Sequence, residues 1–189
     1  MAEQGQHGRR GDGRSGNVAI CASCRRAARD LGAVYRIEPL SQHLPLVETI
    51  AAWHWNEWGH ADPNGSLQDW TESLRARSLP AGVPSTFIAI SEQNGDPVGS
   101  VCLVALDMDT HPELSPWLAG LFVAPSSRGH GIGSALARHA MTRAFEAGVE
   151  TLYLYTSTAT SLYQRLGWHV LFREVYEGQW SDVMAWKPG

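Results

Sequence analysis

The sequence has little cysteine and no long apolar run. No stretch approaches the roughly 20 apolar residues that a membrane-spanning helix needs, and the first residues contain no apolar segment typical of a secretory signal. Only 3 of the 189 residues are cysteine, which argues against a disulfide-stabilised secreted protein. We therefore expect a cytoplasmic protein that contacts no membrane.

The spacing of potential metal ligands is also incomplete. Cys21 and Cys24 form one C-x-x-C pair, but the sequence has no second such pair and no H-E-x-x-H motif, and structural zinc needs four ligands. His54 and His60 lie in a different segment. No strand is expected before the cysteine pair, which argues against a thioredoxin-like site. We expect no bound metal.

Charge is unevenly distributed along the chain. The formal net charge is −4, yet residues 1–36 contain seven arginines against three acidic residues. The rest of the chain is therefore acidic, which disfavours binding to nucleic acid. Such a surface either attracts a cationic substrate, for example an amine, or is simply a solvated acidic face.

Composition predicts a tail followed by one domain. The first 16 residues are polar and glycine-rich, without periodicity. We expect residues 1–32 to form a flexible basic tail. Residues 33–189 are long enough to form a single domain with a substantial core.

Apolar periodicity within this domain predicts a mixed sheet with helices on both faces, an α/β or α+β fold. Strands are expected at residues 33–40, 85–91, 97–106, 117–124, 151–157, 168–178 and 181–188. Helices are expected at 44–60, 66–78, 132–147 and 158–166. In the third of these helices the apolar face should consist of Ile132, Leu136, Ala140 and Phe145, with Gly148 at the C-terminal cap.

Two glycine-rich segments suggest different interpretations. "GDGRSG" at 11–16 has the letters of a dinucleotide-binding motif, but it neither follows a strand nor opens a helix, so it is interpreted as tail. "RGHGIG" at 128–133 lies between an expected strand and an expected helix. The amides of a helix N-terminus favour phosphate, and glycine lets a bulky group approach the backbone. On its own this turn is equally consistent with a phosphate cradle and with a simple tight turn.

At this turn the chain resembles the GNAT N-acetyltransferase superfamily. The family signature is an arginine or glutamine, two residues, a glycine, one residue, and a glycine or alanine. Arg128, Gly131 and Gly133 match it. Upstream, "LAGLFVAP" at 118–125 is similar to the family's fourth strand, which a bulge splays from its neighbour.

A second family signature, a tyrosine four residues before a glycine-aromatic pair, is matched by Tyr163 and the pair Gly167-Trp168. The resemblance covers about residues 33–188. It implies the GNAT fold, a largely antiparallel central sheet with a splayed fourth strand and helices on both faces.

The resemblance also implies acetyl-CoA as the acyl donor. The pyrophosphate would lie on the glycine turn, and the pantetheine arm would run beside the fourth strand, pairing with exposed backbone like an added strand. The implied cofactor-binding residues are Leu121, Phe122, Val123, Arg128, Gly129, His130, Gly131, Ile132, Gly133 and Ser134.

Family members transfer the acetyl group directly within a ternary complex. Tyr163 matches the position that protonates the leaving thiolate, and a phenol is able to donate that proton. A base must deprotonate the amine, and Glu113 is our first candidate, with His111, Asp107 and Asp109 as rivals. A backbone N–H on the splayed strand could stabilise the tetrahedral oxyanion.

Residues 51–70 contain four tryptophans that cannot all lie on one helical face. In the family this region borders the acceptor site, so Trp55 and Trp58, together with Glu57, are candidate contacts for a cationic acceptor. Most of the tryptophans could equally be core residues.

Together these observations predict an acetyl-CoA-dependent N-acetyltransferase that acts on a primary amine of a small molecule or peptide. The alternative is a non-catalytic acetyl-CoA-binding module on the same fold. A homodimer through a sheet edge is possible in such a fold, and a third hypothesis gives the basic N-terminus a nucleic-acid or metal partner of its own.

Overall fold

Apolar and β-branched residues form one sheet of seven strands within residues 34–188, the part of the chain that the computed structural model describes. The strands lie in the order β1-β2-β3-β4-β5-β7-β6, and every neighbouring pair is antiparallel except β4 and β5, which are parallel. Their bounds are β1 Tyr35–Pro39, β2 Ser85–Ser91, β3 Pro97–Val104, β4 Trp117–Val123, β5 Leu152–Thr156, β6 His169–Tyr176 and β7 Gln179–Trp186.

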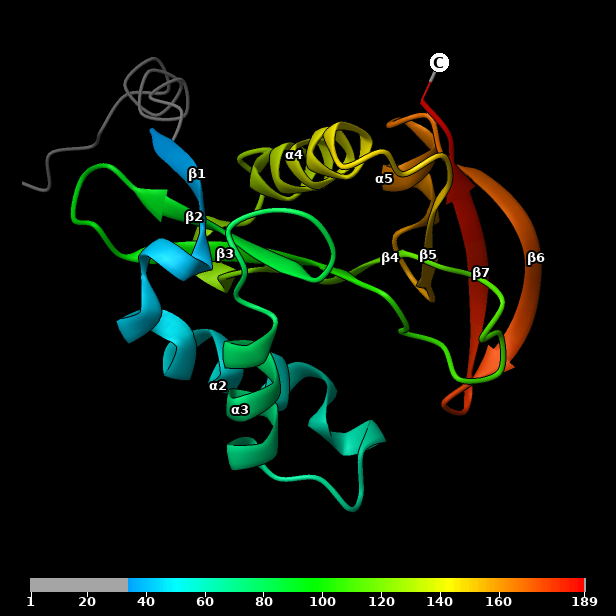
Figure 1. Ribbon diagram of the computed structural model, residues 1–189, viewed down its shortest axis with the longest axis horizontal. Coiled ribbons are helices and arrows are strands. Elements are labelled where there is room, and N and C mark those ends of the chain that lie inside the picture. Colours follow the sequence, from blue (N-terminus) through cyan, green and yellow to red (C-terminus); the bar gives the residue numbers. More distant parts are fainter. Residues whose placement is uncertain (1–33, 189) are drawn as a thin grey trace, which may run out of the picture. The chain divides into compact units, whose positions relative to one another are not determined.

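Helices cover both faces of this sheet, as Figure 1 shows, with α2 and α3 on one side and α4 and α5 on the other. Ser66 caps α3 by accepting the backbone N–H of Asp69 at 3.2 Å. The expected α/β architecture is therefore confirmed. The bounds are α2 Val47–Trp58, α3 Leu67–Ala76, α4 Ile132–Glu146 and α5 Thr160–Gln164, with short 3₁₀ turns at Leu40–Gln42, Leu44–Leu46, Gly59–Ala61 and Pro125–Ser127.

The predicted tail at residues 1–32, with its C-x-x-C pair, lies outside the described residues. No helix in the described part of the chain combines the length and the apolar content needed to cross a membrane.

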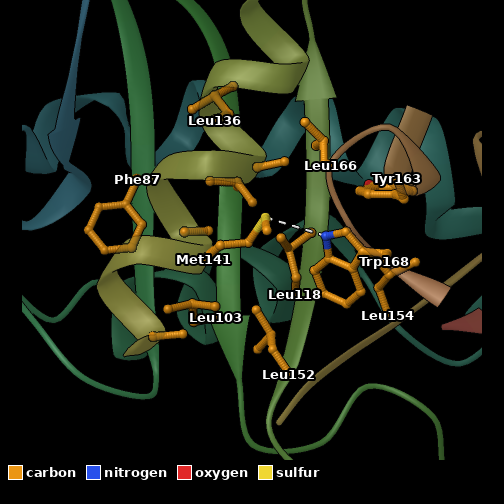
Figure 2. Packing of buried hydrophobic residues seen from close by; sticks show 14 of the residues in the cluster. Phe87, Leu103, Leu118, Leu136, Met141, Leu152, Leu154, Tyr163, Leu166 and Trp168 are labelled. Carbon is orange, nitrogen blue, oxygen red and sulfur yellow. Dashed lines mark hydrogen bonds between the residues drawn. The ribbon is translucent and has the colours of Figure 1, made fainter. Parts of the chain in front are cut away.

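The central strands are buried on both faces, which explains their nearly continuous apolar sequences. In β2, Phe87 and Ala89 belong to the core beneath α4, whereas Ile88 and Ile90 belong to the core beneath α2 and α3. Figure 2 shows the first of these cores, where the indole Nε1 of Trp168 donates a hydrogen bond to Met141 Sδ at 3.4 Å. Two separate apolar layers thus fix the sheet from both sides.

The apolar face of α4 differs from the sequence prediction at one position. Ile132, Leu136 and Ala140 are buried as expected, but Phe145 is 57% exposed and Ala144 takes its place in the core. Each residue turns the helix by about 100°, so residue 144 continues the stripe formed at intervals of four, and residue 145 lies beyond it.

These burials predict unequal effects of two truncations in α4. Leu136→Ala removes a fully buried side chain and should lower the free energy of unfolding by about 2–5 kcal/mol. Phe145→Ala removes an exposed one and should change it by less than about 0.5 kcal/mol. Urea unfolding measures both values, and a loss at Phe145 equal to that at Leu136 would contradict this assignment of the helix faces.

Candidate active site

The site begins where two neighbouring strands part. In the described chain β4 and β5 pair at a single position, Trp117 with Tyr153. Beyond that pair the strands diverge, and a cavity of about 1040 Å³ is lined by residues of both. The expected splayed fourth strand is therefore present.

A bulge in β4 lies at this separation. Ser100 pairs with Phe122 and Cys102 pairs with Ala119, so Val101 faces two residues, Gly120 and Leu121, instead of one. Gly120 has φ +57°. A Cβ atom at this glycine would lie 3.1 Å from His54 Cε1 and 3.3 Å from Cys102 Sγ, so both the backbone conformation and the lack of space require glycine here.

The glycine turn at 128–133 joins the cleft at its other end. Gly129 and Gly131 have φ +81° and +77°, and a Cβ on either would meet nothing within 4 Å. Gly133 has no left-handed backbone, and its Cβ would be in ordinary contact with Val123. The turn therefore requires glycine at two of its three glycine positions.

Gly131 is the N-cap of α4 and has no side chain to accept the first amides. The first hydrogen bond of the helix runs from the N–H of Ala135 to Gly131 O, at 3.0 Å. By helix geometry the amides of residues 132–134 have no partner within the helix, and with the helix dipole they favour an anion.

The structure brings nine of the ten expected cofactor-binding residues to the cleft. His130 is the exception, because its exposed imidazole contacts Ser127 O instead. Arg128 Nε donates to Val123 O at 3.0 Å, and its guanidinium lies 5.8 Å from the centroid of the Phe122 ring, which fastens the turn to the end of β4. The nine residues are Leu121, Phe122, Val123, Arg128, Gly129, Gly131, Ile132, Gly133 and Ser134.

Tyr163, on α5, lines the same cleft and is only 6% exposed. Its ring packs edge-on against Trp168, with centroids 5.9 Å apart (Figure 2). Burial raises the pKa of Tyr163 well above its usual value, so the phenol is protonated at neutral pH and retains a proton to donate.

The candidate base Glu113 does not line the cleft. Its side chain is 66% exposed and bonds His111 Nδ1 at 3.0 Å, while His111 Nε2 bonds Glu174 of β6 at 3.1 Å. In the loop between β3 and β4, His111 thus bonds to β6 and Glu113 bonds to His111. Of the rival candidates for the base, His111 likewise does not line the cleft.

Asp107, the rival at the start of that loop, does line the cleft. Removal from water raises the pKa of Asp107 to about 6, against the opposing effect of Arg77 and with a further rise from Glu177. A carboxyl group with this pKa is ionised at neutral pH. Its pKa is also close to the value that suits a general base.

The tryptophans divide between the cleft and the core. Trp58 and Trp70 line the cleft together with Glu57. Trp55, which we expected to bind substrate, does not, because its ring packs on Trp70 at 5.8 Å and covers Gly59. Trp53 packs on Phe122 at 5.2 Å.

Sequence reasoning missed several cleft residues, above all His54. Burial holds the pKa of His54 at about 3, and Arg77 adds to the effect, so the imidazole is neutral. One signal was available, since His54 follows Val47, Ile50 and Ala51 on the buried stripe of α2, where a polar residue is unusual. Further missed residues with polar side chains, from separate segments, include Asp62, Arg77, Tyr155, Tyr176 and Glu177.

Within residues 34–188 no cluster of three or more histidine, cysteine or acidic residues is arranged to hold a metal ion.

The described chain thus combines a seven-stranded mixed sheet, a splayed fourth strand and a helix without a side-chain N-cap at the end of the gap. The sequence model of the Acetyltransferase (GNAT) family matches residues 47–168. The match covers more than half of the chain, and this chain belongs to the GNAT family. A search of curated protein sequences found no match.

Solved structures share the fold at low sequence identity. A GNAT-family acetyltransferase from Streptococcus pneumoniae is 18% identical, with 82% of this chain and 100% of that chain covered and a TM-score of 0.59. Spermidine N-acetyltransferase from Vibrio cholerae, in complex with CoA and spermine, is 17% identical (81% and 95% covered, TM-score 0.62). An aminoglycoside 6'-N-acetyltransferase complexed with coenzyme A is 15% identical (80% and 96% covered, TM-score 0.62).

Proposed function

We propose that this protein is an acetyl-CoA-dependent N-acetyltransferase that acts on a primary amine. One observation carries the proposal: a single cleft joins the uncapped amide end of α4 to the gap between β4 and β5, and the same cleft contains Tyr163 and Asp107. Family membership and the CoA-bound relatives support it.

The residues around the glycine turn fit acetyl-CoA. The amides of residues 132–134 suit a pyrophosphate, and at Gly129 and Gly131 the space that a Cβ would fill is open. Backbone along β4 that no longer pairs with β5 suits the amides of a pantetheine arm. When bound, acetyl-CoA supplies an activated thioester as the acyl group to be transferred.

The charge of the cleft lining suits a cationic acceptor. Four carboxylates line the cleft together with two arginines, Arg77 and Arg128, and of these Arg77 lowers the pKa of Asp107. Trp58 and Trp70 offer ring faces on which an ammonium group can rest. We infer a small-molecule or peptide amine as acceptor. The carboxylates are Glu57, Asp62, Asp107 and Glu177.

In the proposed reaction Asp107 takes a proton from the ammonium group, which frees the nitrogen lone pair for attack on the acetyl carbonyl carbon. The new N–C bond forms as the C–S bond breaks. Tyr163 supplies a proton to the thiolate sulfur, and its raised pKa ensures that this proton is present. The attacking nitrogen loses its second proton as the amide forms, and this proton restores the Tyr163 phenol, while Asp107 releases its proton to solvent.

Acetyl-CoA binding is tested with two glycines at opposite ends of α4. Gly131 and Gly148 have φ +77° and +81°, and a Cβ at either meets nothing within 4 Å. Alanine should therefore strain the backbone equally at both sites, but only Gly131→Ala should weaken acetyl-CoA binding, by about tenfold or about 1.4 kcal/mol. Isothermal titration calorimetry measures the difference.

Loss of affinity in both variants, or in neither, would contradict the proposal that acetyl-CoA binds at the glycine turn. Wild-type protein that binds acetyl-CoA yet releases no free thiol with any amine of a broad panel would support the alternative of a non-catalytic module.

Tyr163→Phe keeps the buried ring and removes the hydroxyl. We expect kcat to fall by about 10²-fold at saturating substrates, because the thiolate loses its proton donor, while acetyl-CoA affinity is unchanged. Tyr153→Phe is the matched control, since Tyr153 lies on β5 with its ring against Trp117. Wild-type turnover in Tyr163→Phe would remove the assigned role.

The raised pKa of Asp107 predicts that kcat/KM depends on pH. Because its pKa is about 6, it becomes protonated as pH falls through that value, and kcat/KM should decrease there. Asp107→Asn should lower kcat/KM by about 10²-fold and abolish this acidic limb. Glu113→Gln, outside the cleft, should leave the profile intact, and a profile that changes with Glu113 instead would return the role to that residue.

A further inference from the structure

The bulge in β4 has a defined peptide orientation. The hydroxyl of Ser100, on β3, donates to Gly120 O across 3.5 Å. In a trans peptide the C=O of one residue and the N–H of the next point in opposite directions. The Leu121 N–H is therefore directed away from Ser100. Since Leu121 lines the cleft, this amide is a candidate donor to a ligand there.

Ser100 is in turn held by His54 of α2. Ser100 Oγ lies 2.8 Å from His54 Nε2, and the two residues are 0% and 3% exposed. The buried imidazole is neutral, so one ring nitrogen carries a proton. The Ser100 hydroxyl proton is directed to Gly120 O. In the hydrogen bond between His54 and Ser100 the donor is therefore the Nε2–H of His54, and Ser100 Oγ accepts.

The same ring limits the bulge sterically. His54 Cε1 lies 3.1 Å from the position that a Cβ of Gly120 would occupy. The ring also packs edge-on against Trp58, with centroids 5.2 Å apart. The imidazole therefore packs against the bulge directly, and it is also linked to the bulge by two hydrogen bonds that run through Ser100.

We propose that His54 and Ser100 are positioning residues that fix the Gly120–Leu121 peptide, so that the Leu121 N–H donates to the acyl carbonyl oxygen. Neither side chain is assigned a contact with the reacting atoms. The inference rests on the proposed acetyl transfer. Its physical reason is that a donor stabilises developing negative charge most when it is oriented before the reaction begins.

Ser100→Ala removes the relay from the bulge. We expect kcat to fall by about tenfold or more, while the dissociation constant for acetyl-CoA, set mainly at the glycine turn, stays unchanged. His54→Leu should behave in the same way, and His54→Gln should recover most of kcat, because the Gln side-chain amide can donate at similar reach. Steady-state kinetics and calorimetry on the full chain separate the two quantities.

Thr86→Val is the matched control for a purely structural effect. Thr86 is a fully buried hydroxyl on β2 whose partner is Cys102 Sγ at 3.5 Å, and β3 separates its strand from the bulged strand β4. It should lower the unfolding temperature without lowering kcat. An equal loss of kcat in Thr86→Val, or wild-type kcat in Ser100→Ala, would overturn the proposal.

Imidazole ¹⁵N spectra provide a readout that does not need activity. His54 should show the Nε2–H tautomer without titration between about pH 5 and pH 8, and Ser100→Ala should shift the backbone amide resonance of Leu121. An Nδ1–H tautomer, or an unshifted Leu121 amide, would overturn the relay. Wild-type protein that acetylates no amine while showing both spectral features would instead overturn the proposed function and leave the relay standing.

Discussion

The separation of β4 from β5 is the constraint on which the rest of the site depends. The two strands share one pair, Trp117 with Tyr153, and then diverge. Backbone amides and carbonyls that a continuous sheet would pair are thereby turned toward a cleft, where they need other partners. The bulge at Gly120 and Leu121 contributes, because an extra residue bends the strand that carries it. The opening is therefore built into the sheet itself.

Two hydrophobic cores stabilise the sheet despite this opening. The cores beneath α4 and beneath α2 and α3 bury both faces of β2 and β3, so the sheet is held rigidly up to the point where it splits. The same helices supply the walls of the cleft: α4 presents its uncapped N-terminus, and α2 presents His54 and Trp58. Core and site share these elements and also some side chains, since Leu118, Ile132 and Tyr163 belong to the core beneath α4 and also line the cleft.

Burial gives three groups in the cleft different protonation states. Loss of water raises the pKa of Asp107 to about 6, raises that of Tyr163 and lowers that of His54 to about 3. In every case the shift of the pKa is toward the neutral form, although the shift of Asp107 is too small to neutralise it at pH 7. At neutral pH the result is an ionised carboxylate, a protonated phenol and a neutral imidazole. This is a set able to accept a proton, to donate one and to orient a neighbour.

Local signals in the sequence determined the elements, the cap at Ser66 and the glycine turn with its matching tyrosine, because each depends on residues close together in the chain. The tertiary structure decided which side chains meet in the cleft. Asp107 lies there and Glu113 does not, Trp58 does and Trp55 does not, although each pair is close in sequence. The direction in which a loop runs, and whether a residue at the edge of a helical face is turned toward the cleft, depend on packing partners that are distant in sequence. No spacing along the chain records those contacts.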